Sequence, residues 1–322
     1  MNPVLYLLQK QWQFSKGNRK KIVFYYCLFL LANIFSQSQP LVIGLIINYI
    51  QTQTLGPENF WFLIGLLSII LVFDILFWVF HGPARIIEMT NAFLVRANYK
   101  QHLLKGTMDL PITWHNDHHS GDTIDKIEKG TTALFEFSNG TFWIIEGIIM
   151  LIISYTVLVF FNIHASYIVL VILGICVAFI LRVDKKIIAN LRQLNHYENT
   201  IASKIFDTIG NITTVVILRV EKLLQKAIWK KIMHPFSLHK RNLLLNETKW
   251  AVVSIISSLM VFLVLGSYVY LSLTTGIMLG TIYILYGYVE KIRNLFFRFA
   301  WQYGQLVKQM TAVQNSEEIA KD

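Results

Sequence analysis

Three histidines and an aspartate are crowded into the short stretch WHNDHHSG. His115, His118 and His119 follow the spacing His-x-x-His-His, and neutral imidazole is the commonest metal ligand in proteins. A second group, His234 and His239, has four residues between its two histidines. Together the two groups raise the hypothesis of a metal centre.

The histidine spacings resemble two of the three boxes with which membrane-bound desaturases and hydroxylases hold a pair of irons. The chain departs from that family, because its two boxes occur in the reversed order and the third is missing. The other histidines are scattered singly, at His81, His102, His164 and His196. Two alternatives to di-iron chemistry stay open: an adventitious metal contact at this turn, or an exposed polar turn that touches a partner. We expect the polar turn, with no metal site and no catalytic residue.

The composition indicates that lipid surrounds much of the chain. Of the 322 residues, 54% are hydrophobic and only 15% are charged, whereas soluble domains carry about 25% charged residues. Cys27 and Cys176 each lie within a long apolar run. We therefore expect no disulfide and treat both cysteines as small apolar side chains.

Six apolar runs are long enough to cross a membrane, which takes about 20 residues of helix. They lie at residues 22–50, 59–82, 134–161, 164–182, 250–273 and 277–297. The first run contains the polar sequence SQSQP, which is tolerated in a membrane only where it faces protein or water. Pro83 follows the second run and should kink or locally relax its helix. The sequence predicts an all-α polytopic membrane protein with six long transmembrane helices.

Positive charge is confined to one side of these runs. The 29 lysines and arginines lie up to Lys21, between Arg85 and Lys129, between Arg182 and Lys249, or from Lys291 onward. The short segments on the opposite side, QTQTLGPE, NIH and LTTG, contain none. The positive-inside rule then places both termini and both long segments in the cytoplasm. The net charge of +10 thus predicts the topology of a multi-pass inner-membrane protein rather than a nucleic-acid partner.

The two long segments, residues 83–133 and 183–249, keep helical periodicity. We expect each to form a helical hairpin that reaches roughly 35 Å beyond the bilayer, at 1.5 Å per residue. The tip of the first hairpin should fall at TWHNDHHSG, after Leu110-Pro111, and the tip of the second within ASKIFDTIGNI. Residues 1–17 mix apolar, aromatic and polar positions, which predicts a short interfacial elbow helix.

Four stretches resemble the motifs of one membrane family. DLPITWHNDHHSGDTIDKIEKG and SKIFDTIGNITTVVILRVEKLLQK are similar to its two intracellular loops. TTGIMLGTIYILYGYVEKI resembles its entry into the sixth span, with Tyr288 in an aromatic-rich helix. TAVQNSEEIAKD resembles the linker that follows, although Glu318 stands where many members have arginine. In this order and spacing, the chain resembles the transmembrane domain of ATP-binding-cassette (ABC) exporters.

The resemblance implies a domain organisation. Residues 18–310 would form the six-span domain with two coupling helices, and residues 311–322 the start of a linker to a nucleotide-binding domain. The phosphate-cradling pattern Gly-x-x-x-x-Gly-Lys-Ser/Thr is absent from these residues. We therefore expect no cofactor in this chain, with ATP and Mg on an associated nucleotide-binding domain and ATPase activity only in the assembled transporter. The ending within the linker favours an excised domain over a separate subunit.

The resemblance also implies contacts between the hairpin tips and the nucleotide-binding domain. The candidate contact residues are Trp114, His115, Asn116, Asp117, His118, Ser203, Ile205, Phe206 and Ile209. Trp114 is the expected anchor of the first tip and Ser203 the expected N-cap of the second; the alternative is that the second set only packs the hairpin. The other implied partners are a second transmembrane half, identical or different, and a small apolar or amphipathic substrate moved by alternating access.

Four charged residues fall inside the predicted spans at similar depths: Asp74, Glu146, Glu290 and Lys291. Charges within a membrane are costly and mark function by default. They form either a polar ring that lines a translocation cavity or structural pairs, with Asp74 and Lys291 as one such pair. A secondary transporter is the remaining alternative, but we find no repeat of inverted topology, which that class usually shows.

Overall fold

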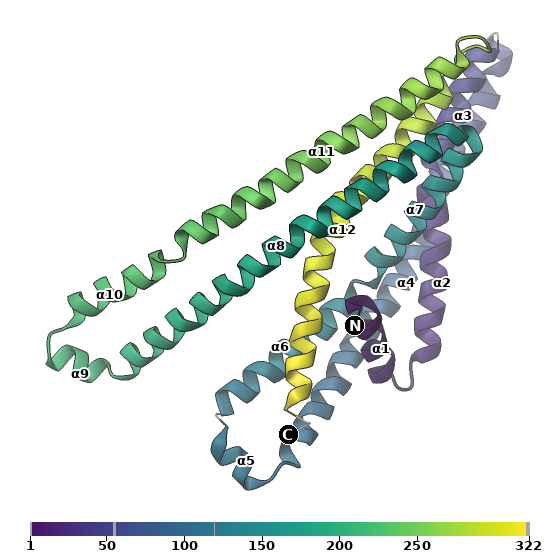
Figure 1. Cartoon of the computed structure of the whole chain (residues 1–322). Helices are drawn as coiled ribbons and strands as arrows, with labels where there is room; N and C mark the ends of the chain where they lie inside the picture. Colours follow the sequence, from purple (N-terminus) through teal and green to yellow (C-terminus); the bar gives the residue numbers. More distant parts are fainter. Residues whose placement is uncertain (1, 54–55, 119, 320–322) are drawn as a thin grey trace. The chain divides into compact units, whose positions relative to one another are not determined.

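The computed structural model describes residues 2–53, 56–118 and 120–319, and within these ranges it contains helices and no strand. This confirms the predicted all-α membrane fold (Figure 1). Within the described part, five helical stretches are long and apolar enough to cross a membrane. They are Arg19–Thr52, Pro57–Met108, Thr141–Phe161, Ile163–Gly210 and Glu221–Ser272.

The predicted sixth span, residues 277–297, lies in the long helix α12 (Leu279–Glu318) and is not one of these five. Glu290, Lys291 and Arg293 fall close together in this helix, and three charges lower the apolar character of the stretch around them. The helix itself is continuous. Its crossing of a membrane therefore stays a prediction from the sequence.

The chain divides into two compact units, one of residues 1–166 with 264–322 and one of residues 167–263. The helices that begin in the first unit, besides α12, are α1 (Pro3–Phe14), α2 (Arg19–Gln37), α3 (Gln39–Thr52), the 3-10 turn η1 (Pro57–Asn59), α4 (Phe60–Met108), α5 (Ile112–Asp117), α6 (Ser120–Asn139), α7 (Thr141–Phe161) and α8 (Ile163–Gly210). Helix α4 continues through Pro83 as a single helix of 49 residues.

The predicted third span, residues 134–161, is divided between α6 and α7 at Gly140. Glu88 of α4, which is fully buried, binds the first residues of α7 at this break. Its carboxylate accepts a hydrogen bond from the Thr141 hydroxyl at 2.6 Å and one from the Phe142 N–H at 2.9 Å, and it pairs with Arg85. A carboxylate on the first N–H groups of a helix satisfies donors that have no partner within that helix. The start of α7 is therefore fixed to α4.

A hydrophobic core joins α1, α4, α6 and α12 near the α5 end of the first unit. Its fully buried members include Leu7 from α1, Val95 and Tyr99 from α4, Leu134 from α6 and Val313 from α12. Helix α1 thus packs one face on protein, whereas Leu5 and Trp12 on its other face are 64% and 43% exposed. The helix predicted for residues 1–17 exists, and its interfacial position stays a prediction.

The segment assigned to a linker, from residue 311, continues α12 as far as Glu318. Ser316 is fully buried and lies 2.7 Å from the Tyr99 hydroxyl, and a Cβ at Gly130 of α6 would come within 2.1 Å of its Oγ. The Tyr6 hydroxyl donates to Glu317 at 2.9 Å. Burial and the Glu317 carboxylate raise the pKa of Tyr6 above its ordinary value. Most of the expected linker is therefore part of the helical core.

At the opposite end of the first unit, α3 and α12 cross at two glycines. A Cβ on Gly280 would lie 1.8 Å from the Gly44 carbonyl oxygen, so the two backbones are in direct contact. Asn48 accepts from the Thr281 N–H at 3.2 Å and Gln51 accepts from the Leu279 N–H at 2.7 Å. Side chains of α3 therefore satisfy the first N–H groups of α12.

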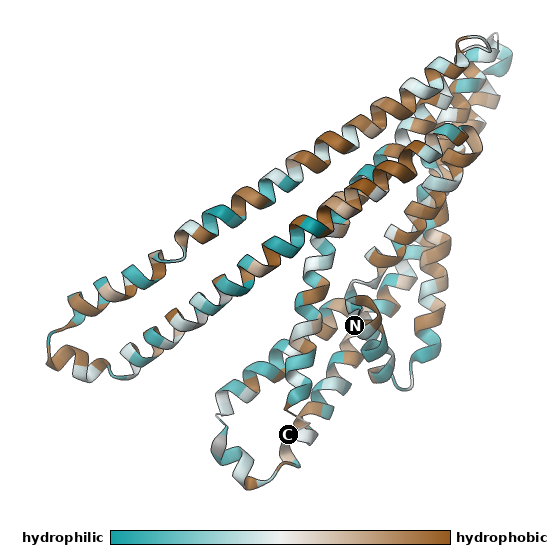
Figure 2. Cartoon of the chain, viewed as in Figure 1, coloured by the Kyte–Doolittle hydropathy of each residue, from teal (hydrophilic) through white to brown (hydrophobic). Residues whose placement is uncertain are grey.

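The second unit contains most of α8, the short helices α9 (Ile212–Ile217) and α10 (Glu221–Met233), and most of α11 (Phe236–Ser272). Within this unit α8 and α11 are joined by an ion pair between Asp184 and Lys249 at 2.8 Å and by a hydrogen bond between Asn190 and Asn242 at 3.3 Å. Hydrophilic residues become more frequent along α8 and α11 toward α9 and α10 (Figure 2). This matches the predicted hairpin that carries its polar residues away from the span.

The glycine crossing predicts opposite effects for two alanine substitutions. Gly280→Ala should lower the free energy of unfolding by about 1–3 kcal/mol, because the methyl group has no space beside the α3 backbone. The matched control is Gly65→Ala in α4, where nothing lies within 4 Å of the added Cβ and the change should stabilise the helix by about 0.5–1 kcal/mol. Thermal unfolding of both variants in detergent measures the difference; equal shifts would contradict the crossing.

Candidate functional site

The first hairpin tip is the six-residue helix α5. Trp114 lies half-buried against the core cluster of the first unit. Its ring stacks on His118, with centroids 4.1 Å apart and planes 11° from parallel, and the His118 Nδ1 lies 2.9 Å from the Trp114 carbonyl oxygen. Trp114 was expected to contact a partner. Instead it packs against the core cluster of the first unit and attaches α5 to that cluster.

Other residues of the tip are available to a partner. Ile112 is 73% exposed, and His115 and Asn116 are also exposed. The side chain of Asp117 and the whole of His119 lie outside the described residues. Among the described residues, no group of three or more histidines, cysteines, aspartates or glutamates is placed to hold a metal ion. Ile112 is therefore the apolar side chain that α5 presents outward.

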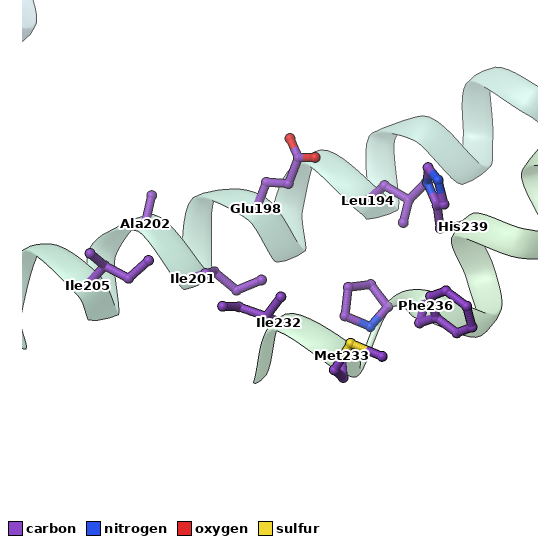
Figure 3. A pocket seen from close by; sticks show the side chains of 10 residues that line it. Leu194, Glu198, Ile201, Ala202, Ile205, Ile232, Met233, Phe236 and His239 are labelled. Atoms are coloured by element: carbon purple, nitrogen blue, oxygen red, sulfur yellow. The ribbon is translucent and has the colours of Figure 1, made fainter. Parts of the chain in front are cut away.

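The residues predicted for the second tip lie in the last turns of α8, and the chain turns only at Asn211. Ser203 is inside α8 and caps no helix, so that part of the prediction is wrong. Ile205 lines a groove between α8 and the α10–α11 junction (Figure 3) and therefore faces the hairpin. Phe206 and Ile209 are 79% and 63% exposed.

The tip itself is the short helix α9, which the sequence analysis did not separate from α8. Val215 is buried, whereas Val216 and Ile217 are 53% and 73% exposed. Arg219, at φ 51°, ends the helix in the left-handed conformation, and the Val220 N–H bonds to the Val215 carbonyl at 3.2 Å. This capping motif usually has glycine at the left-handed position. Because arginine occupies it here, the sequence contains no glycine that would have marked the end of α9.

The four charges predicted at one depth do not pair with one another. Glu146 binds Arg298, 2.8 Å away, and Glu290 pairs with Arg293 one turn further along α12. Asp74 is exposed on α4 and makes no hydrogen bond or ion pair with the described part of the chain. The proposed pair of Asp74 with Lys291 is therefore wrong, because Lys291 binds elsewhere.

Lys291 and Tyr288 of α12 form hydrogen bonds with Gln37, at the break between α2 and α3. Pro40 has no N–H group, and the helix breaks at Ser38. The Gln37 carbonyl accepts from the Tyr288 hydroxyl at 2.9 Å and from the Lys291 Nζ at 3.3 Å, and the Gln37 side-chain oxygen accepts from the same Nζ at 2.7 Å. We call this group of contacts the α12 clasp.

In a regular helix the Gln37 carbonyl and the Leu41 N–H would pair with each other. Here the Tyr288 hydroxyl of α12 donates to the Gln37 carbonyl, and a side chain inserted into the hydrogen-bond ladder is a known cause of helix breaks. Tyr288 is fully buried and Gln37 is 3% exposed. The polar sequence SQSQP indicated that a partner was needed, but the sequence did not identify Tyr288 or Lys291 as that partner.

Comparison with known proteins identifies one matching family. The sequence profile described as the ABC transporter transmembrane region matches residues 22–289, which include α5, α9 and Tyr288 of the α12 clasp, whereas Lys291 lies two residues beyond the match. A comparison with curated proteins finds no match.

The α12 clasp predicts a specific effect of one hydroxyl group. Tyr288→Phe should lower the free energy of unfolding by about 0.5–1.5 kcal/mol, because it removes one of the two hydrogen bonds that the buried Gln37 carbonyl accepts from α12. Tyr286→Phe is the matched control, since Tyr286 is 45% exposed on the same helix. The apparent melting temperatures in detergent should separate the two variants, and an unchanged value for Tyr288→Phe would argue against the clasp.

Proposed function

The chain belongs to the family of ABC transporter transmembrane regions, and on this premise we propose that it is the permease half of an ATP-driven exporter that works as a dimer. The chain supplies the membrane passage, and an associated nucleotide-binding domain supplies ATP and Mg binding. Several parts of this proposal go beyond the family assignment: the dimer, the associated nucleotide-binding domain, export, alternating access and the nature of the cargo.

The observation that carries the proposal is the length of two helices. Helices α4 and α8 have 49 and 48 residues, or about 73 Å each at 1.5 Å per residue, whereas the hydrocarbon core of a bilayer is about 30 Å thick. Each helix leads to a six-residue helix at its far end, α5 or α9. Helices of this length are suited to carrying movement between a cytoplasmic ATPase and the membrane.

The exposed apolar residues of α5 and α9 support docking to such a partner. Ile112 and Ile217 are each 73% exposed, and apolar side chains at the centre of an interface contribute a large part of its binding energy. In the mechanism that we propose, ATP draws two nucleotide-binding domains together and they carry α5 and α9 with them. The cavity then closes toward the cytoplasm and opens on the other side.

The aromatic residues support an apolar or amphipathic cargo. Phe24 of α2, Trp143 of α7 and Tyr286 of α12 are 56%, 49% and 45% exposed. Tyr25 is fully buried and Phe142 is 7% exposed, so these two neighbours pack the fold instead. We assign the exposed set to the passage.

The docking proposal predicts loss of coupling without loss of fold. Ile112→Asp and Ile217→Asp should each reduce ATP hydrolysis by the assembled transporter at least tenfold, which corresponds to a loss of about 1.4 kcal/mol or more in binding. Ile112→Leu and Ile217→Leu, which keep the apolar contact, should retain most of it. ATPase activity in lipid nanodiscs and co-purification of the ATPase measure the effect.

Trp114→Ala separates docking from stability. Because Trp114 packs on its own core cluster, its removal should lower the melting temperature, which the two isoleucine variants should leave nearly unchanged. Full ATPase coupling in both aspartate variants would contradict docking through α5 and α9. Transport that runs on an ion gradient without ATP would favour a secondary transporter.

A further inference from the structure

The turn between α1 and α2 carries a cluster of cations. Lys16, Arg19 and Lys20 are all exposed, and the first acidic residue of the whole chain is Glu58. The side chains of Lys16 and Lys20 make no hydrogen bond or ion pair with the described part of the chain. We call Lys16, Arg19 and Lys20 the corner cations.

The backbone that carries the corner cations has a defined shape. The Asn18 N–H bonds to the Ser15 carbonyl at 3.0 Å, and the Lys21 N–H bonds to the Asn18 carbonyl at 2.9 Å. Gly17 lies within this turn at φ 87°, a left-handed conformation that glycine adopts without steric cost. The cations are therefore held on a hydrogen-bonded turn rather than on a loose loop.

Arg19 is oriented by α1. Its Nε donates to the Trp12 carbonyl oxygen at 3.2 Å, and its guanidinium carbon lies 5.3 Å from the centroid of the Trp12 ring. A guanidinium has five N–H donors, and the four that remain have no partner in the described part of the chain. Because a guanidinium can bind two oxygens of a phosphate at once, Arg19 is prepared for an anionic ligand.

Buried hydrogen bonds attach the end of α1 to its neighbours. Gln11, which is 1% exposed, donates to the Tyr25 hydroxyl and accepts from the Tyr26 hydroxyl, each at 3.2 Å. The Phe14 carbonyl accepts from the Asn98 side chain of α4 at 2.8 Å. A ligand bound at the corner cations would therefore stabilise the packing of α1 on α2 and α4.

The described carboxylates nearest to α1 and α2 are already occupied. Glu317 binds Lys10 and the Tyr6 hydroxyl. Glu88 is fully buried and pairs with Arg85. Neither carboxylate competes with an external anion for the corner cations.

One face of α2 continues from Arg19 into apolar side chains. Val23, Leu30 and Ile34 are 53%, 46% and 48% exposed. Successive spacings of four, seven and four residues from Arg19 place them on one side of the helix, and Figure 2 shows α2 changing from hydrophilic to hydrophobic beyond the turn. Phe24, which we assign to the passage, lies about 100° around the helix from Val23. A cation at the head of an exposed apolar stripe matches the shape of a phospholipid, with its anionic headgroup above its acyl chains.

We propose that the corner cations bind the headgroup of an anionic phospholipid whose acyl chains lie along the apolar stripe of α2. Arg19 contacts the phosphate through two N–H groups, and Lys16 and Lys20 add positive charge. The predicted topology places the corner in the cytoplasmic leaflet, where basic clusters beside a span attract anionic lipids. The site uses no residue of the passage, α5 or α9, so it does not depend on the proposed export function.

Thermal unfolding with defined lipids tests the site without ATP or cargo. The full chain in an uncharged detergent receives dihexanoylphosphatidylglycerol, dihexanoylphosphatidylcholine or inorganic phosphate. Phosphatidylglycerol should raise the melting temperature saturably by about 4 °C or more, because a ligand that binds only the folded state stabilises it. The other two additives should each change it by less than about 1 °C. An equal effect of phosphatidylcholine would overturn the anionic headgroup site, and an equal effect of phosphate would assign the corner to a free anion and overturn the lipid.

Charge substitutions locate the effect on the chain. Arg19→Gln, and the double variant Lys16→Gln with Lys20→Gln, should each weaken the apparent affinity for phosphatidylglycerol about fivefold or more. The double variant removes no described contact within the protein, so it tests the site even if Arg19→Gln fails to fold. The matched control is Arg192→Gln, which removes an exposed arginine of α8 and should stay within about twofold of the original protein. Unchanged affinity in the double variant, or an equal loss in Arg192→Gln, would overturn the proposal.

Discussion

The structure of the first unit depends on one constraint: backbone groups within an apolar layer need partners from the protein itself. The break between α2 and α3 leaves such a group at the Gln37 carbonyl, and α12 supplies Tyr288 and Lys291 to bind it. Gly287 packs against Pro40 and Gly280 against Gly44 along the same helix face. A helix that carries several charges is thus held at a defined position beside the first apolar stretch.

This arrangement gives α12 a role at both of its ends. Near its start it binds α3 and the α2–α3 break, and near its end Val313 and Ser316 are buried against Tyr99 in the core that also includes α1. Because one continuous helix connects the two regions, we expect movement of the core near α5 to displace the clasp as well. Glu88 fixes the start of α7 to α4 in a similar way. Together these contacts make the first unit suited to moving as one body.

The sequence predicted the features that depend on composition and periodicity, and it missed those that depend on individual contacts. The apolar runs and long polar extensions predicted the all-α membrane fold, and Leu110-Pro111 predicted the end of α4 within two residues. The break at Gly140 and the inward position of Trp114 arise from tertiary packing, with Glu88 and the core cluster as partners. The end of α9 was missed because Arg219 stands where glycine is usual. The suggested pair of Asp74 with Lys291 does not form, because depth along a helix does not determine which side of it a residue occupies.

The central claim is that ATP drives this permease between two access states, and site-specific labelling tests it without knowledge of the cargo. A cysteine at the exposed position Tyr286, in the Cys27→Ser background, is placed in the assembled transporter in proteoliposomes. We predict that an impermeant thiol reagent reaches it from the ATPase side without nucleotide, and from the opposite side once ATP and vanadate trap the closed ATPase. Labelling that is the same from both sides, or unaffected by ATP, would contradict the account.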